Sequence, residues 1–168
     1  MFKFKCASCD QIHEGMPTFG FPWPFPYVQV PEAERTRRCV LTSDTCVIDD
    51  AHFYVRGCIE IPVLGSDEVF VWGVWTSLSE KSYRHFLELY DVPKRSHHGP
   101  FFGWLVSPIA IYPEPHLLKT QVHLRDDGTR PYVELEPTDH PLAVEQRNGI
   151  TVERVGEIYA AMTNPKAS

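Results

Sequence analysis

Two neighbouring apolar stretches decide the fold, HFYVRGCIEIPV at residues 52–63 and EVFVWGVWTSL at residues 68–78. Both are rich in Val, Ile, Phe, Tyr and Trp, which favour strands. The segment between them, Leu64-Gly65-Ser66-Asp67, has the composition of a turn. The pattern therefore predicts a hairpin. Because both faces of the second strand are mostly apolar, we expect this strand to lie in mid-sheet, buried on two sides.

Working outward from the hairpin, the patterns predict short strands and short helices. Ser79 and Thr151 each precede a run of apolar residues at helical spacing and are therefore expected to be N-caps. The connection 15–31 is rich in proline and aromatic residues and is not expected to form a regular helix or a central strand. The other expected elements are strands at 2–5, 101–106, 117–124 and 132–135, and helices at 31–38 and 141–147.

The order of these elements indicates an α+β fold. Consecutive hairpins with inserted helices favour a mixed, mostly antiparallel sheet with three or four helices over a doubly wound sheet. The chain has 168 residues, the usual size of one domain. We therefore expect a single domain over residues 1–168. In it, residues 1–50 form a Cys-x-x-Cys knuckle and a Pro/aromatic arm packed on an α+β core at residues 51–168.

Composition and charge argue against two classes of partner. The net charge of −6 disfavours nucleic acid, because phosphate contacts need clustered Lys and Arg. No apolar run approaches the ~18 residues that span a bilayer, and the N-terminus has no signal core. We therefore expect a cytoplasmic protein. In that compartment its five cysteines are thiols or metal ligands rather than disulfides.

The sharpest chemical motif is the pair Cys6 and Cys9. A two-residue spacer lets both thiolates reach one metal ion from a tight turn, and zinc prefers such soft ligands in a tetrahedral set of about four. His13, four residues past Cys9, is near enough to complete the knuckle. Cys46, just before a predicted strand, is our preferred third ligand. Cys39 and His52 are the remaining candidates.

Two other uses of this motif stay open. Cys6 and Cys9 could form a redox pair, although such a pair normally sits at a helix N-terminus, and Gly15 and Pro17 leave little room for a helix here. A zinc ion with an open coordination position could instead activate water for hydrolysis. The nearby acids Asp44, Asp49 and Asp50 would then supply the general base.

Three further groups of residues are more simply explained by structure than by function. Cys58 lies inside an apolar strand and is expected to be a small core residue. His97 and His98 fit a solvated loop, and the aromatic segment 19–27 fits an ordered arm over the core. A polar group near the C-terminus could line a pocket with Arg130 or face solvent; its members are Glu134, Glu136, Asp139, His140 and Glu145.

Several stretches together resemble a bacterial family of uncharacterised proteins, domain of unknown function 2199. They are FKCASC at 4–9, LTSDTCVID at 41–49, FYVRGCIEIP at 53–62, WGVWTSLS at 72–79, FGWL at 102–105 and HPLA at 140–143. The resemblance spans nearly the whole chain and implies a bacterial, cytoplasmic, single-domain protein, but it implies no activity and no metal. Asp10 departs from the glycine that we expect in the family after the second cysteine.

These observations lead to one preferred function. We expect a small binding or interaction protein with an unidentified protein partner and a structural zinc ion. The alternatives are a metal-dependent hydrolase that uses the same zinc and a thiol redox protein.

Overall fold

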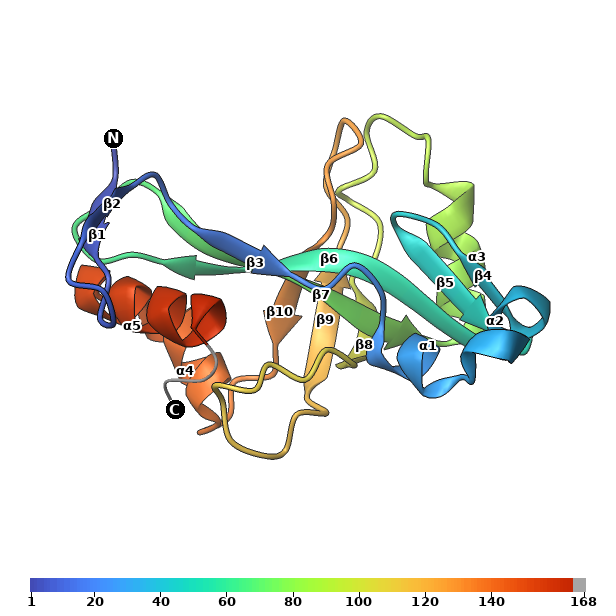
Figure 1. The fold of residues 1–168 in the computed structure, drawn as a ribbon. Helices are drawn as coiled ribbons and strands as arrows, with labels where there is room; N and C mark the ends of the chain where they lie inside the picture. Colours follow the sequence, from blue (N-terminus) through green and yellow to red (C-terminus); the bar gives the residue numbers. More distant parts are fainter. Residues whose placement is uncertain (165–168) are drawn as a thin grey trace.

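The fold is built on a long hairpin of two strands. The computed structural model describes residues 1–164 (Figure 1). In it, β6 (His52–Pro62) and β7 (Val69–Leu78) pair antiparallel from Phe53↔Leu78 to Pro62↔Val69, as the sequence predicts. β7 also pairs with β3 and β8, so it lies in mid-sheet.

The hairpin is part of a small closed barrel. β7 pairs with β8 (Phe101–Leu105), β8 with β9 (Lys119–His123) and β9 with β10 (Tyr132–Leu135), each antiparallel. β10 then pairs in parallel with β6 through Tyr132 and Cys58, which closes the ring. The α+β prediction is confirmed, whereas the barrel was not predicted, because a bridge between segments so distant in sequence leaves no local pattern.

Residues from the first third of the chain extend the barrel sheet. β3 (Thr18–Gly20) pairs in parallel with β7, while β5 (Thr45–Ile48) and β4 (Cys39–Leu41) continue antiparallel from β6. With two parallel pairings, the sheet is more mixed than the mostly antiparallel sheet that we predicted. The division of the chain into one domain remains a prediction.

The structure contains five helices within residues 1–164, one more than the upper number predicted. They are α1 (Phe25–Gln29), α2 (Glu32–Arg38), α3 (Glu80–Glu88), α4 (Pro141–Asn148) and α5 (Val152–Thr163). The additional helix, α1, lies in the connection 15–31. It forms there because its proline occupies the first turn, where the missing N–H costs nothing.

The predicted helix caps are confirmed by hydrogen bonds. The Ser79 side chain accepts a hydrogen bond from the N–H of Ser82, and the Thr151 side chain accepts one from the N–H of Arg154. Gly149 ends α4 with a φ of 81°, a conformation that glycine adopts without strain. None of the helices of residues 1–164 is both long and apolar enough to cross a membrane.

Apolar side chains that alternate along the strands form two separate clusters, one toward each end of the barrel. One apolar cluster includes Phe4 and Ile158 and lies beneath β1 (Lys3–Lys5), α4 and α5. A second includes Val55 and Phe86 and lies beneath α3. Figure 1 shows α5 and α3 at opposite ends of the long hairpin. The two ends of the barrel are therefore covered by different helices and packed on different apolar clusters.

We predict that Gly103→Ala severely destabilises the protein. A Cβ atom at Gly103 would lie 2.2 Å from the Ser77 carbonyl oxygen, so β7 and β8 would have to separate. We expect a loss of about 3 kcal/mol or more, at or above the upper end of typical overpacking penalties, measured by urea unfolding. Gly20→Ala is the control, because the nearest atom to its new Cβ is 3.4 Å away. Equal losses in both variants would contradict the prediction.

Candidate metal centre

The Cys-x-x-Cys segment forms a tight turn between two short strands. β1 (Lys3–Lys5) and β2 (Ile12–Glu14) pair antiparallel, and the Cys6 N–H donates to the Gln11 carbonyl oxygen at 2.9 Å. Asp10 completes the turn with a φ of 56°, in the left-handed region that favours glycine and that Asp tolerates better than most residues. The departure from glycine noted in the sequence therefore falls where the backbone would favour glycine.

This turn brings three potential metal ligands together. The sulfur atoms of Cys6 and Cys9 and a ring nitrogen of His13 all lie within 4.8 Å of one another. The Cys9 Sγ and His13 Nε2 atoms are 3.5 Å apart. Zinc–sulfur and zinc–nitrogen bonds of about 2.3 and 2.0 Å at a tetrahedral angle separate the two atoms by roughly 3.6 Å. The group could therefore hold a metal ion without rearrangement of this pair.

Aromatic side chains hold the imidazole in place. The His13 ring stacks on Phe4, with centroids 5.4 Å apart, and contacts Tyr159 of α5 at 4.6 Å. Phe4 is buried and also touches Tyr159. These ring contacts restrict the orientation of the imidazole. The sequence placed Tyr159 on the apolar face of α5 but gave no sign that it would reach His13.

Cys6 is poised to ionise. Hydrogen bonds from the Ser8 side chain and from the backbone N–H groups of Ser8 and Cys9 lower the pKa of its thiol to about 6. A thiolate is the form of cysteine that binds metals and that reacts as a nucleophile. Cys6 and Cys9 lie in a turn rather than at a helix N-terminus, and both thiols are free in the structure.

The turn docks closely on α5. The Ala7 N–H donates to the Gly156 carbonyl oxygen at 3.4 Å, and a Cβ atom at Gly156 would lie only 2.0 Å from the Lys5 carbonyl oxygen. A glycine in mid-helix normally weakens the helix. Here it permits the backbone of β1 to rest directly on α5.

The structure does not bring Cys46 to this group. Cys46 lies in β5, paired with Tyr54, and is fully buried in a cluster that includes Trp75. Burial raises the pKa of its thiol to about 12. Cys39 and His52 border the same strand, at the end of the molecule away from β1 (Figure 1). The sequence alone did not reveal this separation, because it depends on how the strands associate.

The other polar groups singled out in the sequence do not converge on the sulfurs. Asp44 pairs with Arg130, and Asp49 with Arg38. The rings of His97 and His98 lie against each other, with centroids 4.2 Å apart. The polar group near the C-terminus does not form one site. Glu134 pairs with His123, Glu145 pairs with Arg154, and His140 caps α4.

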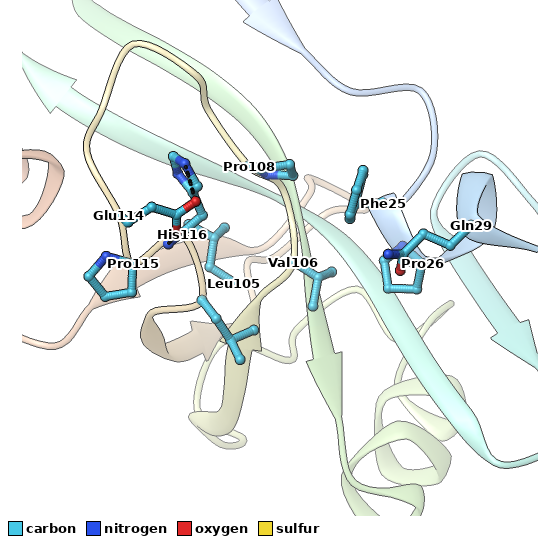
Figure 2. Close-up of a pocket in the computed structure, with 10 residues that line it drawn as sticks. Phe25, Pro26, Gln29, Leu105, Val106, Pro108, Glu114, Pro115 and His116 are labelled. Atoms are coloured by element: carbon cyan, nitrogen blue, oxygen red, sulfur yellow. Dashed lines mark hydrogen bonds and ion pairs between the residues drawn. The ribbon is translucent and has the colours of Figure 1, made fainter.

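Away from the metal group, an apolar pocket lies between α1 and the segment that follows β8 (Figure 2). Its volume is about 480 Å³, within the range of small-molecule sites. Phe25 and Pro26 face Val106 and Pro108 across it, and the Glu114–His116 pair, 3.3 Å apart, lies at its other side. The predicted aromatic arm thus contributes a wall of a pocket as well as covering the core.

The fold and this site define a class: a small α+β barrel protein with an N-terminal Cys-Cys-His group that could hold a metal ion. Residues 5–150 match the family described as uncharacterized protein conserved in bacteria (DUF2199), and the chain belongs to this family. The match confirms the resemblance seen in the sequence. A search of curated proteins and a search of solved structures each found no match.

We predict that Asp10→Gly raises the melting temperature of the protein. Glycine adopts the φ of 56° at no steric cost. The substitution also removes the Lys5–Asp10 ion pair, but both side chains are highly exposed and such pairs contribute little. Asp10→Asn is the control, because Asn tolerates the same backbone and loses only the ion pair. A lower melting temperature for Asp10→Gly than for Asp10→Asn would disprove the prediction.

We predict that Gly156→Ala is destabilising although alanine is the better helix former. Helix propensity alone favours the change by about 1 kcal/mol. The clash with the Lys5 carbonyl oxygen opposes it, and we expect a net loss of about 2 kcal/mol. Chemical denaturation measures whether the free energy of unfolding falls or rises in this variant. Ala161→Gly, at an exposed position of α5, tests propensity without the clash, and a gain in stability for Gly156→Ala would refute the close docking.

Proposed function

We propose that this protein is a small, non-enzymatic binding protein whose N-terminal segment is stabilised by a structural zinc ion. Cys6, Cys9 and His13 hold the ion. The observation that carries the metal assignment is the convergence of their three ligand atoms within 4.8 Å. The ligand atoms are two sulfurs and one nitrogen, which favours zinc over harder cations that prefer oxygen ligands, and the Cys9–His13 distance agrees with tetrahedral zinc geometry.

The surroundings of the group favour a structural role. β1, β2 and the turn between them have few strand hydrogen bonds of their own, and two-stranded sheets are marginal in water. A cation that cross-links Cys6, Cys9 and His13 would stabilise this small sheet against α5. Binding free energy for such a site appears directly as folding free energy.

The apolar pocket beside α1 and the net negative charge of the chain fit a binding protein. Apolar walls with a few polar groups are typical of recognition sites. The net charge of −6 favours encounter with a basic partner through long-range attraction. We also propose a cytoplasmic location, where the cysteines that do not bind zinc would stay reduced.

The zinc assignment is tested by metal analysis of protein purified without a polyhistidine tag. We expect about one zinc ion per chain. Cys6→Ser should lower the zinc content and the melting temperature together. His13→Gln should weaken zinc binding by more than about a hundred-fold, since loss of a residue that only orients a ligand already costs about 10–100-fold.

Cys39→Ser is the matched control, because Cys39 lies in β4, away from the group. It should keep its zinc. Wild-type protein without zinc, or equal zinc in Cys6→Ser and Cys39→Ser, would disprove the site. Zinc lost from Cys6→Ser with unchanged melting would disprove the structural role.

A metal-dependent hydrolase is the second candidate, and one observation favours it. Within residues 1–164 the group contains three ligands, which is the number common in catalytic zinc sites. A cavity of about 290 Å³ beside Cys6 is lined in part by Asp10, Glu153 and Glu157, any of which could act on a bound water. Zinc-dependent ester or phosphoester hydrolysis that Cys6→Ser abolishes would establish this candidate in place of the binding protein.

A thiol redox protein, the third alternative, would differ from the binding protein and from the hydrolase in its metal content. Its Cys6 and Cys9 would cycle between dithiol and disulfide and would carry no zinc. Zinc in the protein as purified, released together with two reactive thiols on chelation, would count against it.

A further inference from the structure

A second candidate site lies at the opposite end of the barrel from the metal centre, and three arginines line it. A small cavity of about 120 Å³ is enclosed by the residue before β5, by β6, by the segment after α3 and by the segment before β10. Its charged lining residues are Arg56, Arg95, Arg130, Asp44 and Asp91. Three guanidinium groups thus face two carboxylates, on a protein whose overall charge is negative.

Arg95 contributes a buried positive charge, and its guanidinium forms no ion pair with a carboxylate of residues 1–164. Its side chain is nearly inaccessible and donates hydrogen bonds to the backbone carbonyl oxygens of Leu89, Tyr90, Arg125 and Thr129. Carbonyl dipoles satisfy its donors but leave its net charge in place. Arg95 is therefore a fixed source of positive potential beneath the cavity.

Arg56 has unused hydrogen-bonding capacity. Its guanidinium lies over the Trp75 ring, 5.9 Å from the centroid, and its Nη1 donates to the Ser43 carbonyl oxygen at 3.3 Å. Its Nε atom is buried and has no hydrogen-bond partner among the described residues. Burial and the nearby Arg130 charge lower the pKa of Arg56. The Arg56 Nη2 atom also has no hydrogen-bond partner among the described residues and, unlike Nε, is not buried, so it is free to donate to a ligand in the cavity.

Asp44 forms its direct ion pair with Arg130, although its charge also acts on Arg56. Its Oδ1 accepts from Arg130 Nε at 2.9 Å, and its Oδ2 accepts from the Tyr90 hydroxyl at 2.7 Å and from Ser43 at 3.2 Å. These contacts hold the carboxylate on one side of the cavity and leave the two terminal nitrogens of Arg130 without a partner among residues 1–164. Asp91 is exposed to solvent, where its charge is screened.

We propose that this arginine pocket binds a phosphoryl group, held between Arg56 and Arg130 in the field of Arg95. Guanidinium groups recognise phosphate through paired, charge-assisted hydrogen bonds. A tetrahedral phosphate carries more charge and more acceptor oxygens than a carboxylate and presents them in several directions, so it can bind two guanidiniums at once. The cavity volume suits a single phosphate rather than a whole nucleotide, so the rest of a ligand would project outward. This inference is independent of the zinc site.

The test is titration with inorganic phosphate at constant ionic strength, with chloride as the replaced ion. We expect saturable binding by calorimetry and a shift of the Arg56 Nε–H signal in nuclear magnetic resonance spectra. Arg56→Gln and Arg130→Gln should each weaken binding about ten-fold or more, as expected for hydrogen bonds to charged groups.

Two further variants separate a built site from general charge attraction. Arg56→Lys keeps the charge but lacks the paired donors of the planar guanidinium, so it should also weaken phosphate binding about ten-fold, and it serves if Arg56→Gln does not fold. Arg84→Gln removes an exposed arginine of α3 that pairs with Glu80, and it should leave binding unchanged.

Three results would overturn the proposal. They are absence of saturable phosphate binding, equal weakening by Arg84→Gln and Arg56→Gln, and tighter binding of acetate than of phosphate. The last result would assign the pocket to carboxylates instead. Phosphate binding that survives removal of zinc by a chelator would show that the two sites are independent.

Discussion

The rest of the structure depends on one contact, the parallel bridge that closes the barrel between β10 and β6. The Cys58 N–H donates to the Pro131 carbonyl oxygen at 2.8 Å, and Tyr132 pairs with Cys58. Gly57 makes the approach possible, since a Cβ atom there would lie 2.6 Å from a Val133 methyl group and 3.0 Å from the Pro131 oxygen. Closure removes two exposed strand edges and defines an inside and an outside for every strand of the ring.

Closure also divides the chemistry of the molecule between two ends. At one end, β1 and β2 lie on α5 and place the two sulfurs beside His13. At the other, the same bridge holds the segment before β10 against β6, which puts Arg130 close to Arg56 and Asp44. Residues that are 86 positions apart, such as Asp44 and Arg130, meet there only because the ring is closed.

The two ends differ in how their side chains are held. The metal group depends on local sequence: the turn 6–11 and the strand that follows it supply all three ligands, and α5 adds only packing through Tyr159 and Gly156. The arginine pocket depends on long-range contacts, since its lining comes from four separate segments of the chain. The geometry of the metal group therefore depends little on closure of the barrel, whereas the arginine pocket requires the closed ring.

By itself, the sequence determined what depends on near neighbours. The β6–β7 hairpin, the helix caps at Ser79 and Thr151, and the closeness of Cys6, Cys9 and His13 follow from local spacing and turn chemistry. Only the tertiary structure decided the barrel closure, the burial of Cys46 away from the other two cysteines, and the meeting of Arg56 with Arg130. These depend on pairings between distant strands, whose register is selected by packing of the whole core and leaves no periodic mark in the sequence.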